Sequence, residues 1–388
     1  MYKYIDLRDT NDYSELKKAA NVIKSGGLVL FPTETVYGLG ANGLDKNAVR
    51  KIYIAKGRNF NNPINLLVSD MEMIETVAED ISPLEYKLME AFFPGPFTII
   101  LKKHEIVPDI VTAGQSFVGV RMPSGTIAKR LVKYSGVPIA APSANISGKL
   151  SGTSFEDILD DFKDKVDLAI NGGNSEIGIE STIVKVIDNI PHILRPGSIT
   201  EEQILQFAPQ VIRDYEDENS NNVSHANHYT PNSNCLLVYG NDNKKMVEKI
   251  KEIAKKYAKP CILASHENIS FYEDNIVIDI GSKTNLNEIA KNIFANLRKA
   301  DNLNPDIIII EGIPKDGIGT AIMNRLMRAC KGNFVEVLWQ KGLLPFVNFF
   351  WHFRSVPFVN LFWHFRSVPF VNFLFLLLSL FLSSHKEY

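Results

Sequence analysis

One segment constrains this chain more than any other: residues 26–40, which read GGLVLFPTETVYGLG. A short apolar run after two glycines predicts a buried strand, here residues 28–31. The strand ends at a proline, and hydroxyls and a carboxylate then follow at its C-terminal end, where open α/β sheets bind small ligands. Gly38 and Gly40 are expected to let a ligand approach the backbone. Taken alone, these residues leave an ordinary polar strand-to-helix turn as the alternative.

Two later segments carry polar groups of a related kind. Residues 55–58 read AKGR and are followed by Asn62 and Pro63, which predicts two cations where a helix ends. Residues 137–148 read VPIAAPSANISG, a second buried strand that ends in hydroxyl and amide groups. A lysine and an arginine suit phosphate oxygens, whereas a solvated helix end and a set of caps and turns are the plainer alternatives.

The rest of the N-terminal half predicts an α/β domain. The chain has 388 residues, enough for two domains that each have a core. Short apolar strands alternate with helical periodicity from residue 16 to residue 213, which indicates a twisted, mixed sheet packed against helices. The predicted strands are 28–31, 66–68, 97–101, 118–122, 139–141 and 182–186, and the predicted helices are 46–55, 83–93 and 126–134.

A polar stretch separates this domain from a second one. Residues 214–234 have no apolar periodicity and predict a linker, in which His225 and the sequence HYTP at 228–231 stand out. Beyond it, predicted strands at 235–239, 261–264 and 306–311 alternate with predicted helices at 244–257 and 286–300. This alternation indicates a smaller domain built on a parallel sheet.

Composition and charge exclude several classes of protein. Apolar residues make up 45% of the chain and charged residues 22%, which is usual for a globular protein. A formal net charge of −2 argues against a large basic surface for nucleic acid. Cys235, Cys261 and Cys330 are scattered without a CxxC spacing, so neither a disulfide framework nor a zinc site is indicated. The N-terminal residues lack the apolar core of a secretory signal, and we expect a cytoplasmic protein.

The C-terminal tail repeats itself. The sequence PFVN begins at Pro345, Pro357 and Pro369, a repeat of 12 residues. A membrane helix needs about 20 apolar residues, and the run after Arg366 carries Pro369 and Asn372. Near-identical repeats without a core of their own indicate an aberrant tail, as from translated repeat DNA after a shifted reading frame. We expect no stable membrane insertion, with a membrane or partner contact as the alternative.

The motifs PTETVYGLGA, AKGR, FFPGPFTIIL, VRMP, APSANISG, IESTIV and LRPGS follow one another along the chain. In this order they resemble the Sua5/YrdC family, in its long, two-domain form, from about Ile5 to about Gly332. The resemblance implies a YrdC-like twisted mixed sheet with packed helices and a smaller Rossmann-like α/β C-terminal domain. It implies a catalytic domain at 1–213, a linker or active-site lid at 214–234, a C-terminal domain at 235–334 and the repetitive tail at 335–388.

The activity that the resemblance implies is that of an L-threonylcarbamoyladenylate synthase, a nucleotidyltransferase. Such enzymes make threonylcarbamoyl-AMP and pyrophosphate from L-threonine, bicarbonate or CO2, and ATP, for the t6A modification at position 37 of tRNA. Mg²⁺ is expected with ATP, although no carboxylate cluster marks a metal site built by the protein. The chain is expected to meet tRNA only indirectly, through the downstream threonylcarbamoyl transferase complex.

The resemblance also implies the residues of the site. Lys56 and Arg58 match the leading phosphate ligands, and they are the predicted catalytic residues. The predicted ATP-binding residues are Arg58, Asn62, Ser143, Ser151, Arg195 and Tyr229, and the predicted threonine-binding residues are Thr35, Arg121, Ala141 and Ser181. Arg121 suits the free carboxylate of the amino acid. Tyr229 belongs to the linker that, in long relatives, folds over the active site; a plain spacer is the alternative.

The chain departs from the family pattern at Leu67, where many relatives have a histidine that contacts threonine, and at Phe117, where relatives often have a threonine that contacts ATP. Three other functions stay open. An RNA-binding module is disfavoured by the balanced charge. Carbamoyl transfer to other substrates, as in hydrogenase-maturation relatives, is disfavoured because nothing in this sequence matches the zinc-finger and acylphosphatase-like parts of those relatives. A damaged copy of the enzyme is suggested by the repeats after Gly342.

Overall fold

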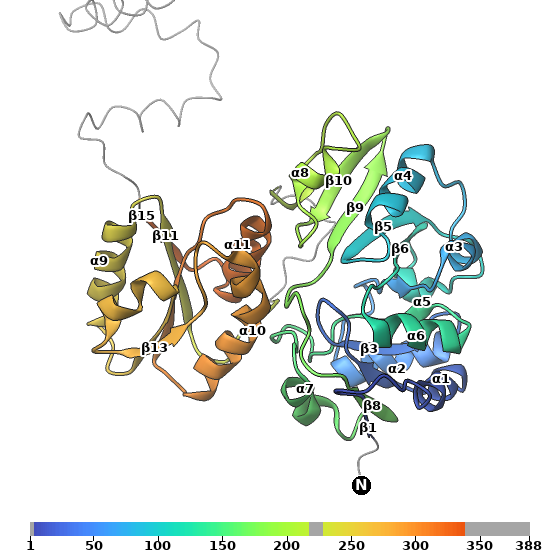
Figure 1. Ribbon diagram of the computed structural model, residues 1–388, viewed down its shortest axis with the longest axis horizontal. Helices are drawn as coiled ribbons and strands as arrows, with labels where there is room; N and C mark the ends of the chain where they lie inside the picture. Colours follow the sequence, from blue (N-terminus) through green and yellow to red (C-terminus); the bar gives the residue numbers. More distant parts are fainter. Residues whose placement is uncertain (1–3, 217–227, 338–388) are drawn as a thin grey trace, which may run out of the picture. The chain divides into compact units, whose positions relative to one another are not determined.

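The computed structural model describes residues 4–216 and 228–337, which form two β-sheets covered by helices (Figure 1). The N-terminal sheet has ten strands in the order β1-β8-β2-β3-β7-β4-β6-β5-β9-β10, with both parallel and antiparallel neighbours. Its elements are β1 (Tyr4–Asp6), α1 (Leu16–Lys24), β2 (Val29–Phe31), β3 (Gly38–Asn42), α2 (Lys46–Lys56), β4 (Leu66–Leu67), α3 (Met71–Val77), α4 (Pro83–Phe92), β5 (Phe97–Lys102), α5 (Asp109–Thr112), β6 (Phe117–Arg121), α6 (Thr126–Ser135), β7 (Ile139–Ala140), α7 (Phe155–Phe162), β8 (Leu168–Asn171), β9 (Thr182–Ile187), β10 (Ile190–Arg195) and α8 (Glu201–Ile204).

Strand β2 shows how the apolar runs of the N-terminal domain serve two cores. Leu28 and Leu30 belong to the core that includes α2, and Val29 and Phe31 belong to the core that includes α1 and α6. Successive side chains of a strand point to opposite faces of the sheet, so a strand covered on both faces reads as a continuous apolar run. The mixed sheet that the sequence predicts is therefore confirmed, with β2 in its interior.

The C-terminal sheet has five strands, all parallel, in the order β13-β12-β14-β11-β15. Ile308 and Ile310 of its central strand share a core with α10 and α11, and Ile307 and Ile309 share a core with α9 on the opposite face (Figure 1). The elements of this domain are β11 (Cys235–Gly240), α9 (Asn243–Ala254), β12 (Pro260–Ala264), a 3-10 helix (His266–Tyr272), β13 (Ile276–Asp279), α10 (Leu286–Asn302), β14 (Ile307–Glu311), α11 (Ile318–Ala329) and β15 (Phe334–Val337). A short 3-10 helix (Asp214–Glu216) precedes them and packs against β10 of the N-terminal sheet. The predicted parallel sheet is confirmed.

Local sequence signals set the ends of α2. The side chain of Asp45 accepts hydrogen bonds from the backbone N–H groups of Asn47 and Ala48 and so caps the first turn. The helix ends at Gly57, which adopts φ 60°, a left-handed conformation that glycine reaches without strain. Because the helix stops there, Lys56 lies in its last turn and Arg58 lies just beyond it.

The predicted strands and helices all occur, with small shifts at their ends, and two expectations need correction. Helix α9 ends at Ala254 rather than at residue 257, because its apolar face ends there and Tyr257 is 39% exposed. Gly38 and Gly40 both lie in β3, antiparallel to β2; Gly38 lines the cavity described below, whereas Gly40 does not approach a ligand site. A Cβ atom on Gly40 would lie 2.6 Å from the ring of Phe31, so packing explains the absence of a side chain there.

The two domains share apolar contacts. Val36, Leu150 and Ile179 of the N-terminal domain pack in one cluster with α10 and α11. Tyr229, at the end of the predicted linker, joins the same cluster, and its ring stacks on Phe294 with centroids 5.1 Å apart. Within the described residues 4–216 and 228–337, no helix is long and apolar enough to cross a bilayer. The predictions for His225 and for residues 338–388 of the repetitive tail lie outside the described residues. Residues 335–337, which were predicted as part of that tail, belong to β15 and pair with β11.

We expect Ile309→Ala to destabilise the C-terminal domain by about 2–5 kcal/mol, because the change leaves a cavity in a buried central strand. Ile276→Ala, at a position that is 36% exposed on the edge strand β13, should cost less than about 1 kcal/mol. Urea unfolding midpoints of the two variants measure the difference. Equal shifts would contradict the central position of β14.

Candidate functional site

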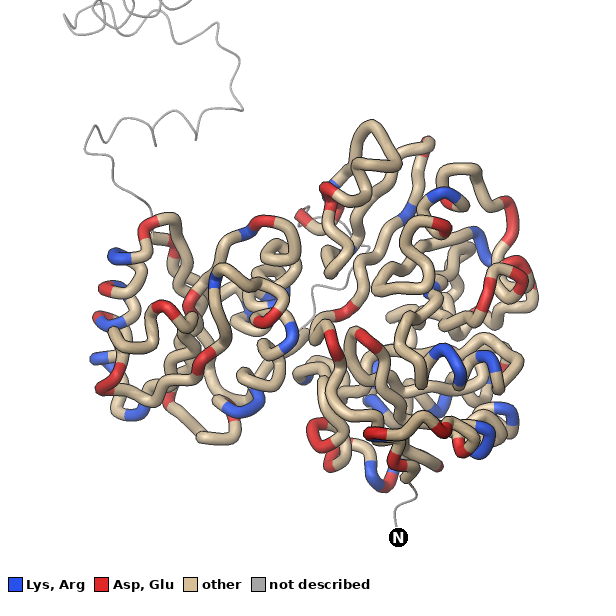
Figure 2. The backbone as a smooth tube through the Cα atoms, in the orientation of Figure 1, with Lys and Arg blue, Asp and Glu red and all other residues tan. Residues whose placement is uncertain are grey.

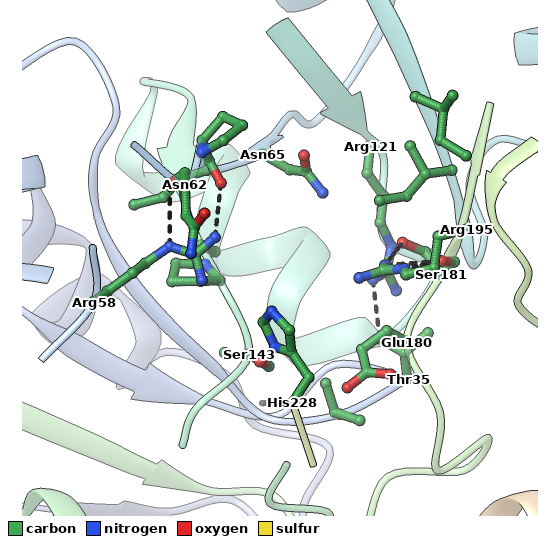
Figure 3. Close-up of a pocket in the computed structure, with 18 of the residues that line it drawn as sticks. Thr35, Arg58, Asn62, Asn65, Arg121, Ser143, Glu180, Ser181, Arg195 and His228 are labelled. Carbon is green, nitrogen blue, oxygen red and sulfur yellow. Dashed lines mark hydrogen bonds between the residues drawn. The ribbon is translucent and has the colours of Figure 1, made fainter. Parts of the chain in front are cut away.

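A cavity of about 570 Å³ opens where several strands of the N-terminal sheet end. This volume lies in the range of small-molecule sites, about 300–1,000 Å³. All but one of the residues predicted for the site line it: Thr35, Lys56, Arg58, Asn62, Arg121, Ala141, Ser143, Ser181, Arg195 and Tyr229. Ser151 is the exception; it is fully buried behind the wall. In Figure 3, Arg58 and Asn62 lie on one side, Arg121, Ser181 and Arg195 on the other, and His228 between them.

The fold explains why residues far apart in sequence meet here. Thr35 follows β2, Arg121 ends β6 and Ser143 follows β7, and the three strands belong to one sheet. Ser181 immediately precedes β9, and Arg195 ends its antiparallel partner β10. These side chains lie close together because the ends of their strands do. Residues 26–40 predict polar groups at such a strand end.

Arg121 is held by a buried ion pair at one end of the cavity. Its Nη2 donates to Oε1 of Glu34 at 2.5 Å, its Nη1 to Oγ1 of Thr35 at 2.9 Å, and its Nε to the carbonyl of Gly95 at 3.2 Å. Burial alone would raise the pKa of Glu34, but the charge and hydrogen bonds of Arg121 outweigh it and hold that pKa below its ordinary value. Arg121 and Glu34 are 7% and 4% exposed, so water screens the pair weakly.

The opposite wall is built from α2 and the loop after β7. Nζ of Lys56 donates to the carbonyls of Ser143 and Asn145, each at 2.5 Å, and the residue is only 1% exposed. Burial, with the charge of Arg58 adding to it, lowers the pKa of Lys56 well below its ordinary value. Arg58 donates from Nε to the carbonyl of Asn62 at 3.2 Å and from Nη2 to that of Pro63 at 2.9 Å. Lys56 thus holds the loop that presents Ser143, and Arg58 is fixed by its own loop.

A third wall centres on Glu180. Its Oε1 accepts a hydrogen bond from Oγ of Ser151 at 2.6 Å, and its Oε2 pairs with Nε of Arg325 at 3.1 Å. The next residue, Ser181, accepts two hydrogen bonds at its carbonyl from Arg195, at 3.1 and 2.8 Å. Burial raises the pKa of Glu180, but Arg325 and Arg195 outweigh it and leave that pKa lowered, so the carboxylate is charged. Burial also lowers the pKa of Arg195 to about 10.

Positive charge dominates the cavity. Among the described residues that line it, six are cationic and one is a carboxylate: Lys56, Arg58, Arg121, Lys185, Arg195 and Arg328 against Glu180. Burial, and then the charge of Arg328, lowers the pKa of His228 to about 4, so its imidazole is neutral at pH 7. A cavity with this balance is suited to a small molecule that carries several negative charges.

Comparisons with known proteins fit this geometry. Residues 21–197 match the Sua5/YciO/YrdC family model, described as telomere recombination, and residues 199–330 match the model of the threonylcarbamoyl-AMP synthase C-terminal domain. A threonylcarbamoyl-AMP synthase of Pyrococcus abyssi is 38% identical over 339 residues, which covers 86% of this chain and 99% of the relative. The chain belongs to the two-domain Sua5 family of threonylcarbamoyl-AMP synthases. It is a synthase that uses ATP as a substrate.

Other relatives agree. The synthase of Bacillus subtilis is 37% identical over 346 residues, covering 86% of this chain and 98% of the relative. A solved structure of P. abyssi Sua5 that carries two substitutions superimposes with a TM-score of 0.81 at 37% identity, covering 87% of this chain and 99% of that one. A crystal structure of P. abyssi Sua5 complexed with L-threonine has a TM-score of 0.78 at 37% identity, covering 86% and 99%.

The two departures of this synthase from the family pattern both face the cavity. Leu67 pairs with Arg121 across neighbouring strands and is 3% exposed. Phe117 is 38% exposed, and Nζ of Lys185 lies 3.7 Å from its ring centroid, a cation–π contact.

The sequence patterns do not identify four residues of the site that the structure reveals. Glu34 and Glu180 lie inside the motifs PTETVYGLGA and IESTIV, where a carboxylate next to a predicted binding residue is the signal that the sequence offers. Arg325 and Arg328 lie in the C-terminal domain, and no local pattern connects them to the cavity. Within residues 4–216 and 228–337, no group of three or more His, Cys, Asp or Glu side chains is arranged to hold a metal ion.

We expect Glu34→Gln to destabilise the synthase by about 3–5 kcal/mol at pH 7, because it leaves Arg121 buried without a charged partner. Ionised Glu34 stabilises the folded state above its ordinary pKa of 4.5, and this contribution is lost as the pH falls through its lowered folded value. The gap between wild type and variant should therefore narrow below about pH 4.5.

Thermal or urea unfolding between pH 3 and pH 8 measures that gap. Glu75→Gln on α3 removes an exposed carboxylate and serves as the control, with no expected effect beyond about 0.5 kcal/mol. A gap for Glu34→Gln that stays constant across the whole range would contradict the ion-pair assignment.

Proposed function

We propose that this cavity binds L-threonine at its Arg121 end and the triphosphate of ATP along the walls that carry Arg58, Ser143 and Arg195. The observation that carries the proposal is that all these residues line one cavity, in which six cations face one carboxylate. P. abyssi Sua5, which is 37% identical to this chain, was crystallised with L-threonine, and this supports the proposal that this chain also binds threonine.

Arg121 has donors left for the carboxylate of threonine. A guanidinium carries five N–H groups, and the contacts with Glu34, Thr35 and Gly95 use three of them. The two that remain are fixed in direction because the ion pair holds the guanidinium in place. Thr35, Ala141 and Ser181 line the same end and complete the proposed threonine site.

The proposed nucleotide site uses the other walls. Arg58 offers a planar fork to the phosphates, and Asn62, Ser143 and Tyr229 offer smaller polar groups beside it. Arg195 donates a hydrogen bond to the carbonyl of Ser181, which fixes the position of its guanidinium. Lys56 acts through the loop that it holds, and Ser151 acts through Glu180. We assign both of these as residues that position others, whereas the sequence predicted direct contacts with ATP.

The reaction needs anions to meet. The neutral amine of threonine adds to CO2 and releases a proton, or condenses with bicarbonate and releases water, to give a carbamate. A carbamate oxygen then attacks the α-phosphorus of ATP, and the bond from that phosphorus to pyrophosphate breaks. Cations fixed around the phosphates reduce the repulsion between carbamate and triphosphate and stabilise the charge on the leaving group. The buried ring of Tyr229 and the linker after residue 228 would limit water at the labile carbamate. We propose that Mg²⁺ arrives with ATP and takes most of its ligands from the phosphates.

The product would serve t6A modification of tRNA through a separate transferase complex. In Figure 2, lysines and arginines are interspersed with aspartates and glutamates along both domains, a pattern that does not favour the RNA-binding alternative. A cytoplasmic location stays a prediction; the three cysteines are free and buried, which suits a reducing compartment.

The proposal is tested by pyrophosphate release from ATP and Mg²⁺ by the full chain. Release should require both threonine and bicarbonate, and mass spectrometry should identify threonylcarbamoyl-AMP as the second product. Pyrophosphate release that does not depend on threonine would contradict the proposed substrates.

Two substitutions separate the proposed halves of the site. Arg121→Gln should raise the KM for threonine about ten- to hundredfold and change the KM for ATP little, since one charge-assisted contact is lost at one end. Arg58→Gln should instead raise the KM for ATP by a similar factor and change the KM for threonine little. Arg50→Gln, on the exposed face of α2, is the matched control and should leave both constants unchanged. If both variants raised the same KM, the division of the cavity would be wrong.

A further inference from the structure

One cation of the cavity comes from the C-terminal domain. Arg328 lies in the last turn of α11 and lines the cavity together with residues of the N-terminal sheet. None of the sequence motifs of the catalytic domain includes it. The position of this side chain depends on how α11 is fixed against the N-terminal domain.

Arg325 fixes α11 at that point. It is fully buried, pairs with Glu180, and donates from Nη1 to the carbonyl of Pro196 at 2.5 Å. Residues three apart lie on neighbouring positions of one helix face. Arg325 therefore sets the face that carries Arg328 toward the cavity wall that Glu180 and Arg195 form.

Arg328 has no ion-pair partner among the residues that the structure describes. Its side chain is half-buried, and within the described residues it makes no hydrogen bond or ion pair, whereas Arg121 and Arg325 each hold a carboxylate. Burial lowers the pKa of Arg328; Arg325 adds to this effect, and Tyr229 and Glu180 oppose it, but the guanidinium stays charged at pH 7. A half-buried, unpaired charge is costly unless an anion completes it.

The charge of Arg328 converges with those of the proposed nucleotide wall. The charges of Arg328, Arg58 and Arg195 all act on the imidazole of His228, which lies between the two opposite walls in Figure 3. Arg121 lies on the same side of the cavity as Arg195 in Figure 3, but its guanidinium is already paired with Glu34. An anion that meets Arg58 and Arg195 is therefore the one within reach of Arg328.

We propose that Arg328 is a phosphate-binding residue that the C-terminal domain supplies to the active site, and that it contacts the β- and γ-phosphates of bound ATP. The inference rests on the proposed function, because it takes the triphosphate to lie along the Arg58 and Arg195 walls. It assigns a role to the second domain: α11 completes a nucleotide site that the first domain leaves open on one side.

The test compares nucleotides that do and do not carry the outer phosphates. Binding of α,β-methylene ATP, which cannot be cleaved between the α- and β-phosphorus, and of AMP is measured by calorimetry with Mg²⁺ on the full chain. Arg328→Met should weaken binding of the ATP analogue about ten- to hundredfold and change binding of AMP less than about twofold. Arg328→Lys, which keeps the charge, should recover much of the loss.

Lys299→Met, which removes an exposed cation from α10 in the same domain, is the matched control and should bind both nucleotides like wild type. Arg328→Met with unchanged affinity for the ATP analogue would overturn the inference, as would equal losses for the analogue and AMP. If wild type itself fails to bind the analogue, the proposed function fails rather than this inference.

A second measurement needs no variant. In the wild-type chain, modification of Arg328 by phenylglyoxal, followed by peptide mass spectrometry, should slow at least severalfold when the ATP analogue is bound and should not slow with AMP. Equal reactivity of Arg328 with and without the analogue would overturn the inference even if Arg328→Met failed to fold.

Discussion

The structure depends most on how Glu180 is satisfied. A carboxylate that is 6% exposed is costly unless it is paired and hydrogen-bonded, and Glu180 meets both conditions through Arg325 and Ser151. Arg325 comes from α11 of the second domain, so the pair joins the two domains at the edge of the cavity. Since Ser181 follows Glu180 directly, this interface sets the position of a lining residue and, through its carbonyl, of Arg195.

The two carboxylates of the site have the same physical task. Glu34 holds Arg121, and Glu180 holds Arg325, and in both pairs the arginine keeps the carboxylate charged despite burial. Neither acid is arranged with others to bind a metal within the described part of the chain. The other cations that line the cavity leave it with a net positive charge, which favours binding of a triphosphate beside a carbamate.

The sequence predicted what local pattern can encode. Apolar runs located β2, β5 and β9, and the AKGR sequence located the end of α2, so the strand end that precedes Thr35 and the helix end that precedes Arg58 were predicted. Contacts between Glu180 and Arg325 could not be predicted, because these residues are 145 positions apart and no period connects them. The misassignment of Gly40 had the same origin: only the fold places the ring of Phe31 against it.

The second domain shapes the synthase site through the ion pair between Arg325 and Glu180. A double-mutant cycle of Arg325→Met and Glu180→Gln, measured on kcat/KM for threonine-dependent pyrophosphate release, tests it most directly. We expect strong coupling, about 1–3 kcal/mol, so that the double variant is about as impaired as the worse single variant. Losses that simply multiply, in folded proteins, would mean that the two residues act independently and would contradict the account.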